Sequence, residues 1–169
     1  MGVSVNQLNS EHTLLYGSQN ETPTRRRSAR IDTDTQKFAV SIGTAGNNAE
    51  LKSEDVVTLN TYHNMVAVLS STAEVILDGD LVVSDVVNDD ASTGLNDYLF
   101  CYNYANLGAR FNTKAKMYFA KIWDEDNALA RNFVPAQRIS DSVVGMYDTV
   151  TGTFFTNAGS GGFIAGPEM

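Results

Sequence analysis

Residues 74–84 read Glu-Val-Ile-Leu-Asp-Gly-Asp-Leu-Val-Val-Ser, with an apolar run on each side of Asp78-Gly79. An Asp-Gly pair between two apolar runs is one of the strongest short-range signals for a β-hairpin, because the turn needs positive φ angles that glycine adopts readily. The stretch therefore predicts two antiparallel strands joined by a tight turn.

Similar units of strand and turn lie on both sides of this hairpin. Residues 28–42 contain two strand-like runs around a turn at Asp32-Thr-Asp-Thr35, and Gly43 follows the second run. Further strands are predicted at 64–69, 114–123, 143–147 and 151–155, and a polar loop at 88–94. No window of a dozen residues shows a helical apolar stripe with caps. The pattern predicts an all-β antiparallel β-sandwich, of the jelly-roll kind, in a single domain over residues 1–169.

Aromatic residues alternate with smaller ones in the segment 97–104. The alternating positions are Tyr98, Phe100, Tyr102 and Tyr104. A period of two predicts one strand with its aromatic side chains on a single face. That face could belong to the core of a sandwich, or it could stack on sugar rings.

The composition excludes several classes of partner. The 169 residues carry a formal net charge of −8, which argues against nucleic acid, whose affinity comes mainly from neutralised phosphates. No apolar run approaches the length of about 18 residues that a membrane span needs, so we expect no membrane insertion. The start of the chain has neither a basic nor a long apolar region, and we expect no signal peptide. A virion or extracellular location then requires release inside a particle, by lysis or as part of a longer chain.

Motifs of catalysis are absent from the sequence. There is no nucleophile-elbow, phosphate-loop, dinucleotide or zinc signature. Cys101 is the single cysteine, His12 and His63 are isolated, and the glycines at 159–162 predict a flexible turn. A glycanase would need a pair of carboxylates on a concave face, and no strand pattern supplies one. We therefore expect no enzymatic activity and no cofactor, apart from calcium.

Candidate binding residues fall in three groups. The basic cluster at 25–30, with Arg25 and Arg27, could contact acidic or sulfated glycans, or could protect a sheet edge from aggregation. Tyr102, Tyr104 and Trp123 could stack on sugar rings, or could pack in the core. Asp124 and Asp126 lie in a segment rich in oxygen ligands and could bind Ca²⁺, although turn formation explains such aspartates equally well.

The last third of the chain contains a more specific pattern. Residues 114–124 read Lys-Ala-Lys-Met-Tyr-Phe-Ala-Lys-Ile-Trp-Asp, and residues 129–136 read Leu-Ala-Arg-Asn-Phe-Val-Pro-Ala. Residues 145–159 read Gly-Met-Tyr-Asp-Thr-Val-Thr-Gly-Thr-Phe-Phe-Thr-Asn-Ala-Gly, and residues 163–168 read Phe-Ile-Ala-Gly-Pro-Glu. These segments resemble the C-terminal part of laminin-G-like, concanavalin A-like domains in structural proteins of phages and prophages of gut bacteria.

The resemblance is dense over residues 97–167 and has two departures. Asn132 stands where that family has Asp, and Trp123 stands where it has Tyr. The resemblance implies a jelly-roll sandwich, often found at the end of a tail or fibre protein, and some laminin-G-like domains bind Ca²⁺ at a loop rim. It implies no catalytic residue.

Two functions follow as expectations. The first is a non-catalytic binding module that recognises cell-surface carbohydrate, with a homo-oligomer supplying avidity. The alternative is a decoration or assembly protein that contacts other proteins of a capsid, tail or baseplate.

Overall fold

The computed structural model describes residues 1–8, 13–20, 25–44, 47–69, 73–83, 93–110, 113–157 and 162–166. Three features singled out in the sequence fall wholly or partly outside the described residues. They are residues 88–92 of the predicted loop at 88–94, residues 159–161 of the glycine-rich turn at 159–162, and His12. No helix occurs in the described ranges, and hence none that could cross a membrane.

The chain divides into two compact units. The larger comprises residues 4–115, and the smaller joins residues 1–3 to residues 116–169. The first strand, β1 (Gly2–Val5), has residues in both units. The strands of the larger unit then begin with β2 (Thr13–Gln19), β3 (Arg25–Ile31), β4 (Lys37–Thr44) and β5 (Asn47–Val56). They continue with β6 (His63–Leu69), β7 (Ala73–Leu77), β8 (Asp80–Val83), β9 (Tyr98–Leu99), β10 (Tyr102–Tyr104) and β11 (Ala109–Arg110). The expectation of a single domain over residues 1–169 stays a prediction.

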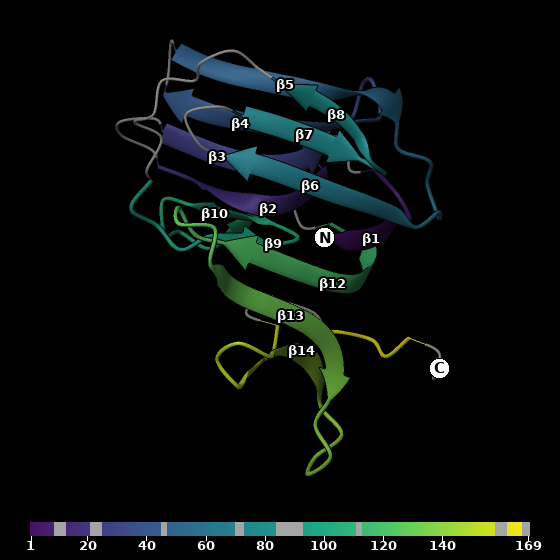
Figure 1. Cartoon of the computed structure of the whole chain (residues 1–169). Coiled ribbons are helices and arrows are strands. Elements are labelled where there is room, and N and C mark those ends of the chain that lie inside the picture. Colours follow the sequence, from purple (N-terminus) through teal and green to yellow (C-terminus); the bar gives the residue numbers. More distant parts are fainter. Residues whose placement is uncertain are drawn as a thin grey trace. The chain divides into compact units, whose positions relative to one another are not determined.

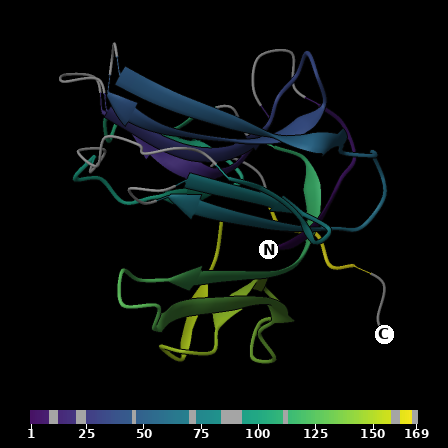
Figure 2. The ribbon, with the colours of Figure 1, turned by 45° about the horizontal axis from the view of Figure 1, so that its top comes forward.

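The larger unit is a β-sandwich of two layers (Figures 1 and 2). One sheet has the order β11-β10-β2-β3-β4-β5, with β9 also paired to β2, and the other contains β6, β7 and β8 in sequence. Strands β4 and β5 pack against β7, and β5 also packs against β8. Among the strand pairs described, all are antiparallel except β2 with β10. The predicted all-β antiparallel sandwich is confirmed in this unit.

Apolar side chains from both layers fill the space between them. The fully or almost fully buried ones include Leu15, Ile31, Phe38, Val40, Ile42, Leu51, Met65, Val75 and Leu77. Burying each such side chain stabilises the fold by about 1.5–3 kcal/mol. This is the interaction that holds the two sheets face to face.

The predicted hairpins are confirmed. β7 pairs with β8, and Leu77 opposite Asp80 is the pair next to the turn. The turn residues Asp78 and Gly79 have φ angles of 54° and 107°. The hairpin across Asp32–Thr35 joins β3 to β4. β2 and β5 were not predicted from the sequence.

The prediction of one strand over 97–104 is wrong. Phe100 has a φ of 60°, which turns the chain between β9 and β10. β9 runs antiparallel to β2, with Leu99 opposite Tyr16, whereas β10 runs parallel to it, with Asn103 opposite Ser18. Aromatic residues do alternate with smaller ones in the sequence, but the reversal at Phe100 prevents the four aromatic residues from sharing one face of a single strand.

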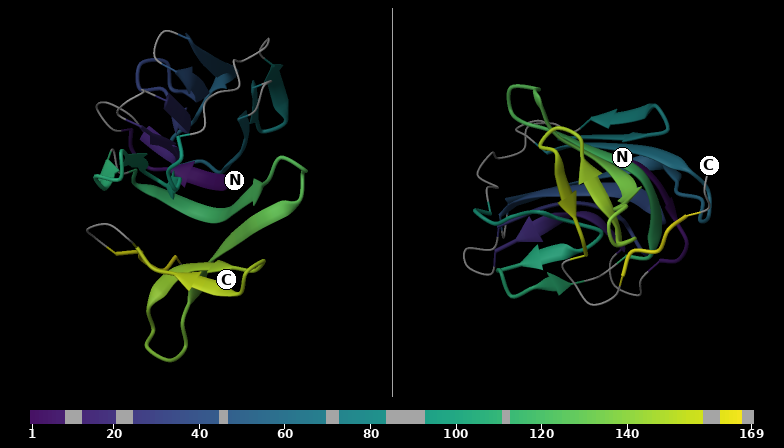
Figure 3. Two further views of the ribbon diagram at one scale, coloured as in Figure 1. Left: turned by 90° about the vertical axis from the view of Figure 1, so that its left-hand side faces the viewer. Right: turned by 90° about the horizontal axis from the view of Figure 1, so that it is seen from below.

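The smaller unit is an antiparallel meander (Figure 3). Its strands are β12 (Ala115–Trp123), β13 (Leu129–Gln137), β14 (Val144–Asp148) and β15 (Thr153–Phe155), paired in that order. The predicted strands at 114–123, 143–147 and 151–155 are confirmed by β12, β14 and β15. A turn at residues 125–127 joins β12 to β13.

Candidate binding trough

A row of small residues crosses the outer face of the β2-β3-β4 sheet. Gly17 on β2 lies opposite Ser28 on β3, and Ser28 lies opposite Ser41 on β4. The next partner in the row is Glu50 on β5. We call the three small residues, Gly17, Ser28 and Ser41, the central row, and Glu50 stands at its end.

The alternation of side chains along β4 explains why only short side chains stand on the outer face at the central row. Phe38, Val40 and Ile42 point into the core and are buried. The residues between them, Ala39 and Ser41, therefore point to the outer face. Because the outer residues are small, the long side chains on β3 and β5 stand above them on either side.

Gly17 leaves the β2 position of the central row without a side chain. A Cβ built on it would lie 2.6 Å from the backbone oxygen of Arg27 and 3.0 Å from the Cβ of Ser28. Its φ of 156° is also one that residues with a side chain rarely adopt. Only glycine lets β2 approach β3 this closely.

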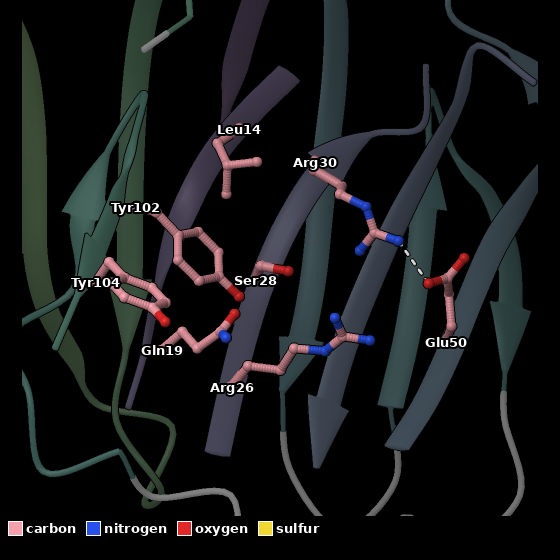
Figure 4. Close-up of a pocket in the computed structure, with 8 residues that line it drawn as sticks. All are labelled: Leu14, Gln19, Arg26, Ser28, Arg30, Glu50, Tyr102 and Tyr104. Atoms are coloured by element: carbon pink, nitrogen blue, oxygen red, sulfur yellow. Dashed lines mark hydrogen bonds and ion pairs between the residues drawn. The ribbon is translucent and has the colours of Figure 1, made fainter. Parts of the chain in front are cut away.

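Longer side chains rise around the row and enclose a hollow of about 380 Å³, which we call the trough (Figure 4). Its lining residues are Leu14, Gln19, Arg26, Ser28, Arg30, Glu50, Tyr102 and Tyr104. Figure 4 shows the two tyrosines on one side of Ser28, and Arg30 and Glu50 on the other. The trough thus has an aromatic end and a charged end.

The aromatic end is fixed by polar contacts. Tyr102 is 6 % exposed and its hydroxyl is hydrogen-bonded to Ser28. Burial raises the pKa of Tyr102 more than this hydrogen bond lowers it, so the phenol stays neutral at physiological pH. The guanidinium of Arg110 lies 5.3 Å from the ring centroid of Tyr104, within cation–π range.

The charged end is an ion-pair network. Arg30 donates to the Ser41 hydroxyl and, at 2.5 Å, to Oε2 of Glu50. The other carboxylate oxygen of Glu50 lies 3.2 Å from Nζ of Lys52, which also binds Asp32 at 2.8 Å. Burial alone would raise the pKa of Glu50, but Arg30 and Lys52 outweigh it and lower that pKa. Glu50 is therefore ionised in the folded protein.

The basic cluster at 25–30 divides between the two faces of β3. Arg26 and Arg30 line the trough, whereas Arg27 points the other way and binds Asp97 through Nε at 3.2 Å and Nη2 at 2.5 Å. Arg25 shares the parity of Arg27 and does not line the trough. Of the predicted binding residues, the structure thus brings together Tyr102 and Tyr104, without Arg25 or Arg27.

Asp97 is the centre of a partly buried polar cluster on the inner side of the sheet. The hydroxyl groups of Tyr16 and Ser18 both donate to it, in addition to Arg27. Burial, followed by the charge of Asp97, raises the pKa of Tyr16. The Ser18 hydroxyl is also within 2.7 Å of Thr93 Oγ1. These bonds attach residues 93–97 to β2 and β3, so Arg27 has a structural role here.

The predicted calcium ligands and Trp123 belong to the smaller unit. Oδ1 of Asp124 accepts hydrogen bonds from the backbone N–H groups of Asp126 and Ala128, which makes Asp124 a turn-forming residue. In the part of the chain that the structure describes, no group of three or more His, Cys, Asp or Glu side chains could hold a metal ion. Trp123 is 50 % exposed at the end of β12.

The predicted basic cluster at 25–30 contains Arg26, Ser28 and Arg30, but Arg25 and Arg27 were singled out within it, and Gln19 and Glu50 were not predicted. The sequence contained a signal for three of the lining residues. Alternate residues of a strand point to opposite faces, so Arg26, Ser28 and Arg30 share one face of β3 and Arg25 and Arg27 share the other. Glu50 could not be found in this way, because its strand was not predicted.

Comparisons with models of protein families, with curated proteins and with solved structures found no match to this chain.

Proposed function

We propose that the chain is a non-catalytic carbohydrate-binding module of a phage or prophage structural protein, and that the trough is its binding site. The observation that carries the proposal is the pairing of an aromatic end, Tyr102 and Tyr104, with a polar and charged end in one open hollow. Sugars present apolar ring faces together with many hydroxyl groups. They therefore suit a site that combines aromatic surface with a few fixed hydrogen-bonding groups.

The residues of the trough favour binding over hydrolysis. Glu50 is the one carboxylate among the lining residues, and it is engaged by Arg30. Glycoside hydrolysis needs two carboxylates flanking the bond. The virion setting and the laminin-G-like jelly-roll assignment are supported by the resemblance of residues 97–167. A homo-oligomeric parent assembly would supply the avidity that weak sugar stacking requires.

The test is a glycan array probed with the multimerised domain, followed by titration of the monomer. Tyr104→Ala removes the aromatic surface at one end of the trough, and we expect it to abolish binding on the array. The matched control is Tyr62→Ala, a tyrosine of the same unit that is 48 % exposed and outside the trough. Absence of binding to every glycan, with the monomer at millimolar concentration, would overturn the proposal.

A second candidate function is supported by the smaller unit. Large apolar side chains are 39–50 % exposed on its strands, namely Tyr118, Trp123, Leu129, Tyr147 and Phe155. Exposed apolar side chains mark protein-interaction surfaces where they form a contiguous patch. A decoration or assembly role predicts that virions lacking the protein assemble poorly or lose stability. Normal assembly and stability of such virions would contradict it.

A further inference from the structure

The sheet of β6, β7 and β8 is the second layer of the sandwich (Figure 2), and its outer face is unusually apolar. On β7, the side chains of Ala73, Val75 and Leu77 are buried in the core. Because side chains alternate along a strand, the residues between them, Glu74 and Ile76, lie on the outer face.

Ile76 is the middle of an aliphatic row that crosses three strands. Its partners in register are Val66 on β6 and Leu81 on β8. Leu81 is 54 % exposed, and Val66 and Ile76 are partly exposed. Val68, which lies opposite Glu74, extends this apolar surface along β6. We call Val66, Val68, Ile76 and Leu81 the aliphatic face.

The outer face of the other layer is different. It carries the trough, whose lining includes Arg26, Ser28, Arg30 and Glu50. An antiparallel sheet with one solvated face normally alternates apolar residues inside with polar residues outside, and the layer that holds the trough follows this rule. The layer of β6, β7 and β8 departs from it. A contiguous apolar surface with a polar rim is a mark of an interaction site.

Acidic groups border the aliphatic face. Glu74 and Asp78 lie two residues before and after Ile76, and the carboxylate of Asp78 accepts hydrogen bonds from His63 and from the backbone N–H of Asn64. Residues 53–109, from which this layer is built, contain nine Asp and Glu residues and no Lys or Arg. A partner that covers the aliphatic face therefore meets a negative rim that this segment does not neutralise.

We propose that the aliphatic face docks a protein partner whose contact surface carries aliphatic side chains flanked by Lys or Arg. Charge complementarity selects this partner over a second copy of the chain. A two-fold contact through the same face would bring Glu74 and Asp78 close to the acidic groups of the other copy. The proposal is independent of carbohydrate binding, since the trough lies on the opposite layer of the sandwich.

The probe is a synthetic peptide that matches the spacing along β7. The outer face of β7 presents a carboxylate, an aliphatic side chain and a carboxylate at every second residue. A blocked peptide with the repeat Lys-Thr-Val-Thr presents Lys and Val in the same alternation when it is extended. Two control peptides, with the repeats Glu-Thr-Val-Thr and Lys-Thr-Ser-Thr, reverse the charge or remove the aliphatic group. Each is immobilised on a sensor, and the full-length protein is passed over it at two salt concentrations.

The variants remove one feature of the face at a time. Leu81→Ser should weaken binding to the Lys-Thr-Val-Thr peptide by about tenfold, because it removes the most exposed aliphatic side chain of the face. Its matched control is Leu107→Ser, a leucine on the other layer that is 67 % exposed. Glu74→Lys should weaken binding by about three- to tenfold, less so at high salt, whereas Glu125→Lys, at an exposed turn of the smaller unit, should have little effect.

Contrary outcomes overturn the proposal in distinct ways. Equal binding of the Lys-Thr-Val-Thr and Lys-Thr-Ser-Thr peptides would show that charge alone attracts them. Full binding by Leu81→Ser, or no binding by the wild type, would remove the aliphatic face as the site. A dimer in sedimentation that Leu81→Ser dissociates would assign the face to a second copy of the chain. The glycan array reports on the trough separately, so failure of one proposal leaves the other standing. Circular dichroism of each variant separates loss of binding from loss of fold.

Discussion

Arg30 on β3 and Glu50 on β5 form an ion pair of 2.5 Å across the strand that separates them. The pair can span β4 because both β4 residues on this face are small: Ala39 lies opposite Arg30, and Ser41 lies opposite Glu50 and accepts a hydrogen bond from Arg30. The small residues of the central row therefore have a double effect. They leave space for the trough, and they let charged groups two strands apart meet at its end.

Gly17→Ala should destabilise the protein more than a glycine substitution in open space. The new Cβ would meet the Arg27 backbone oxygen and the Ser28 side chain, and relief of such a clash in a packed sheet costs about 1–3 kcal/mol. The matched control is Gly108→Ala, since Gly108 has a φ of 113° but nothing within 4 Å of the added Cβ. Urea denaturation of both variants measures the difference. Equal destabilisation would show that φ strain alone, and not the close approach of β2 to β3, requires the glycine.

Asp97→Asn should destabilise the larger unit. The side chain of Asp97 is 10 % exposed and is bonded to Tyr16, Ser18 and Arg27. Removal of its charge weakens these bonds and leaves Arg27 poorly paired. We expect a loss of about 1–3 kcal/mol, below that of a fully buried pair because Arg27 is 36 % exposed to screening solvent.

The control for this prediction is Asp141→Asn. Asp141 pairs with Arg138 at the same distance of 2.5 Å, but both side chains are more than 40 % exposed. An exposed pair contributes little, so this variant should unfold close to the wild type in the same urea titration. Comparable losses in the two variants would contradict the structural role assigned to the Asp97 cluster.

Asp148 should make the smaller unit sensitive to acid. It is buried, and it accepts hydrogen bonds from the backbone N–H groups of Asn132 and Val150 and from the Thr151 hydroxyl. Burial would raise its pKa, but these bonds outweigh burial and lower the pKa below the ordinary value of 3.8. The stabilisation is therefore present above the pKa of the unfolded chain and is lost as the pH falls through the lower pKa of the folded state.

The measurement is the Tm of wild type and Asp148→Asn as a function of pH. The variant should unfold at a lower temperature near neutral pH, and the difference in Tm should shrink as the pH falls below about 4. A difference that stays constant over this range would show that Asp148 contributes through packing and not through its charge.

The sequence predicted those parts of the fold that depend on local chemistry. The Asp78-Gly79 turn and the hairpin across Asp32–Thr35 were identified because turns with positive φ or Asp side chains have local residue signatures. β5 was missed because residues 47–56 have no simple apolar alternation, and register shifts where it pairs with β4. The reversal at Phe100 was missed because nothing in a phenylalanine signals a positive φ, which tertiary pairing with β2 imposes.

Only part of the trough could be predicted from the sequence, for a related reason. Tyr102 and Tyr104 stood out as aromatic residues, and the arginines stood out as a cluster. Glu50 joins them only through the register of β3, β4 and β5, which is a long-range property. Which arginines line the trough depends on the face of β3 to which each side chain points, and this can be tested directly.

Arg26→Gln should weaken glycan binding by about tenfold or more, the usual effect of removing a hydrogen bond to a charged group. Arg25→Gln makes the same change in charge one residue earlier, and that side chain belongs to the opposite face of β3. Long-range attraction of an acidic glycan is reduced almost equally by both variants, so only a contact in the trough distinguishes them. The measurement is calorimetric titration of both variants with the same glycan at two salt concentrations. Equal losses that disappear at high salt would mean that the cluster acts through its overall charge, whereas a loss specific to Arg26 that persists would place the ligand on the outer face of β3.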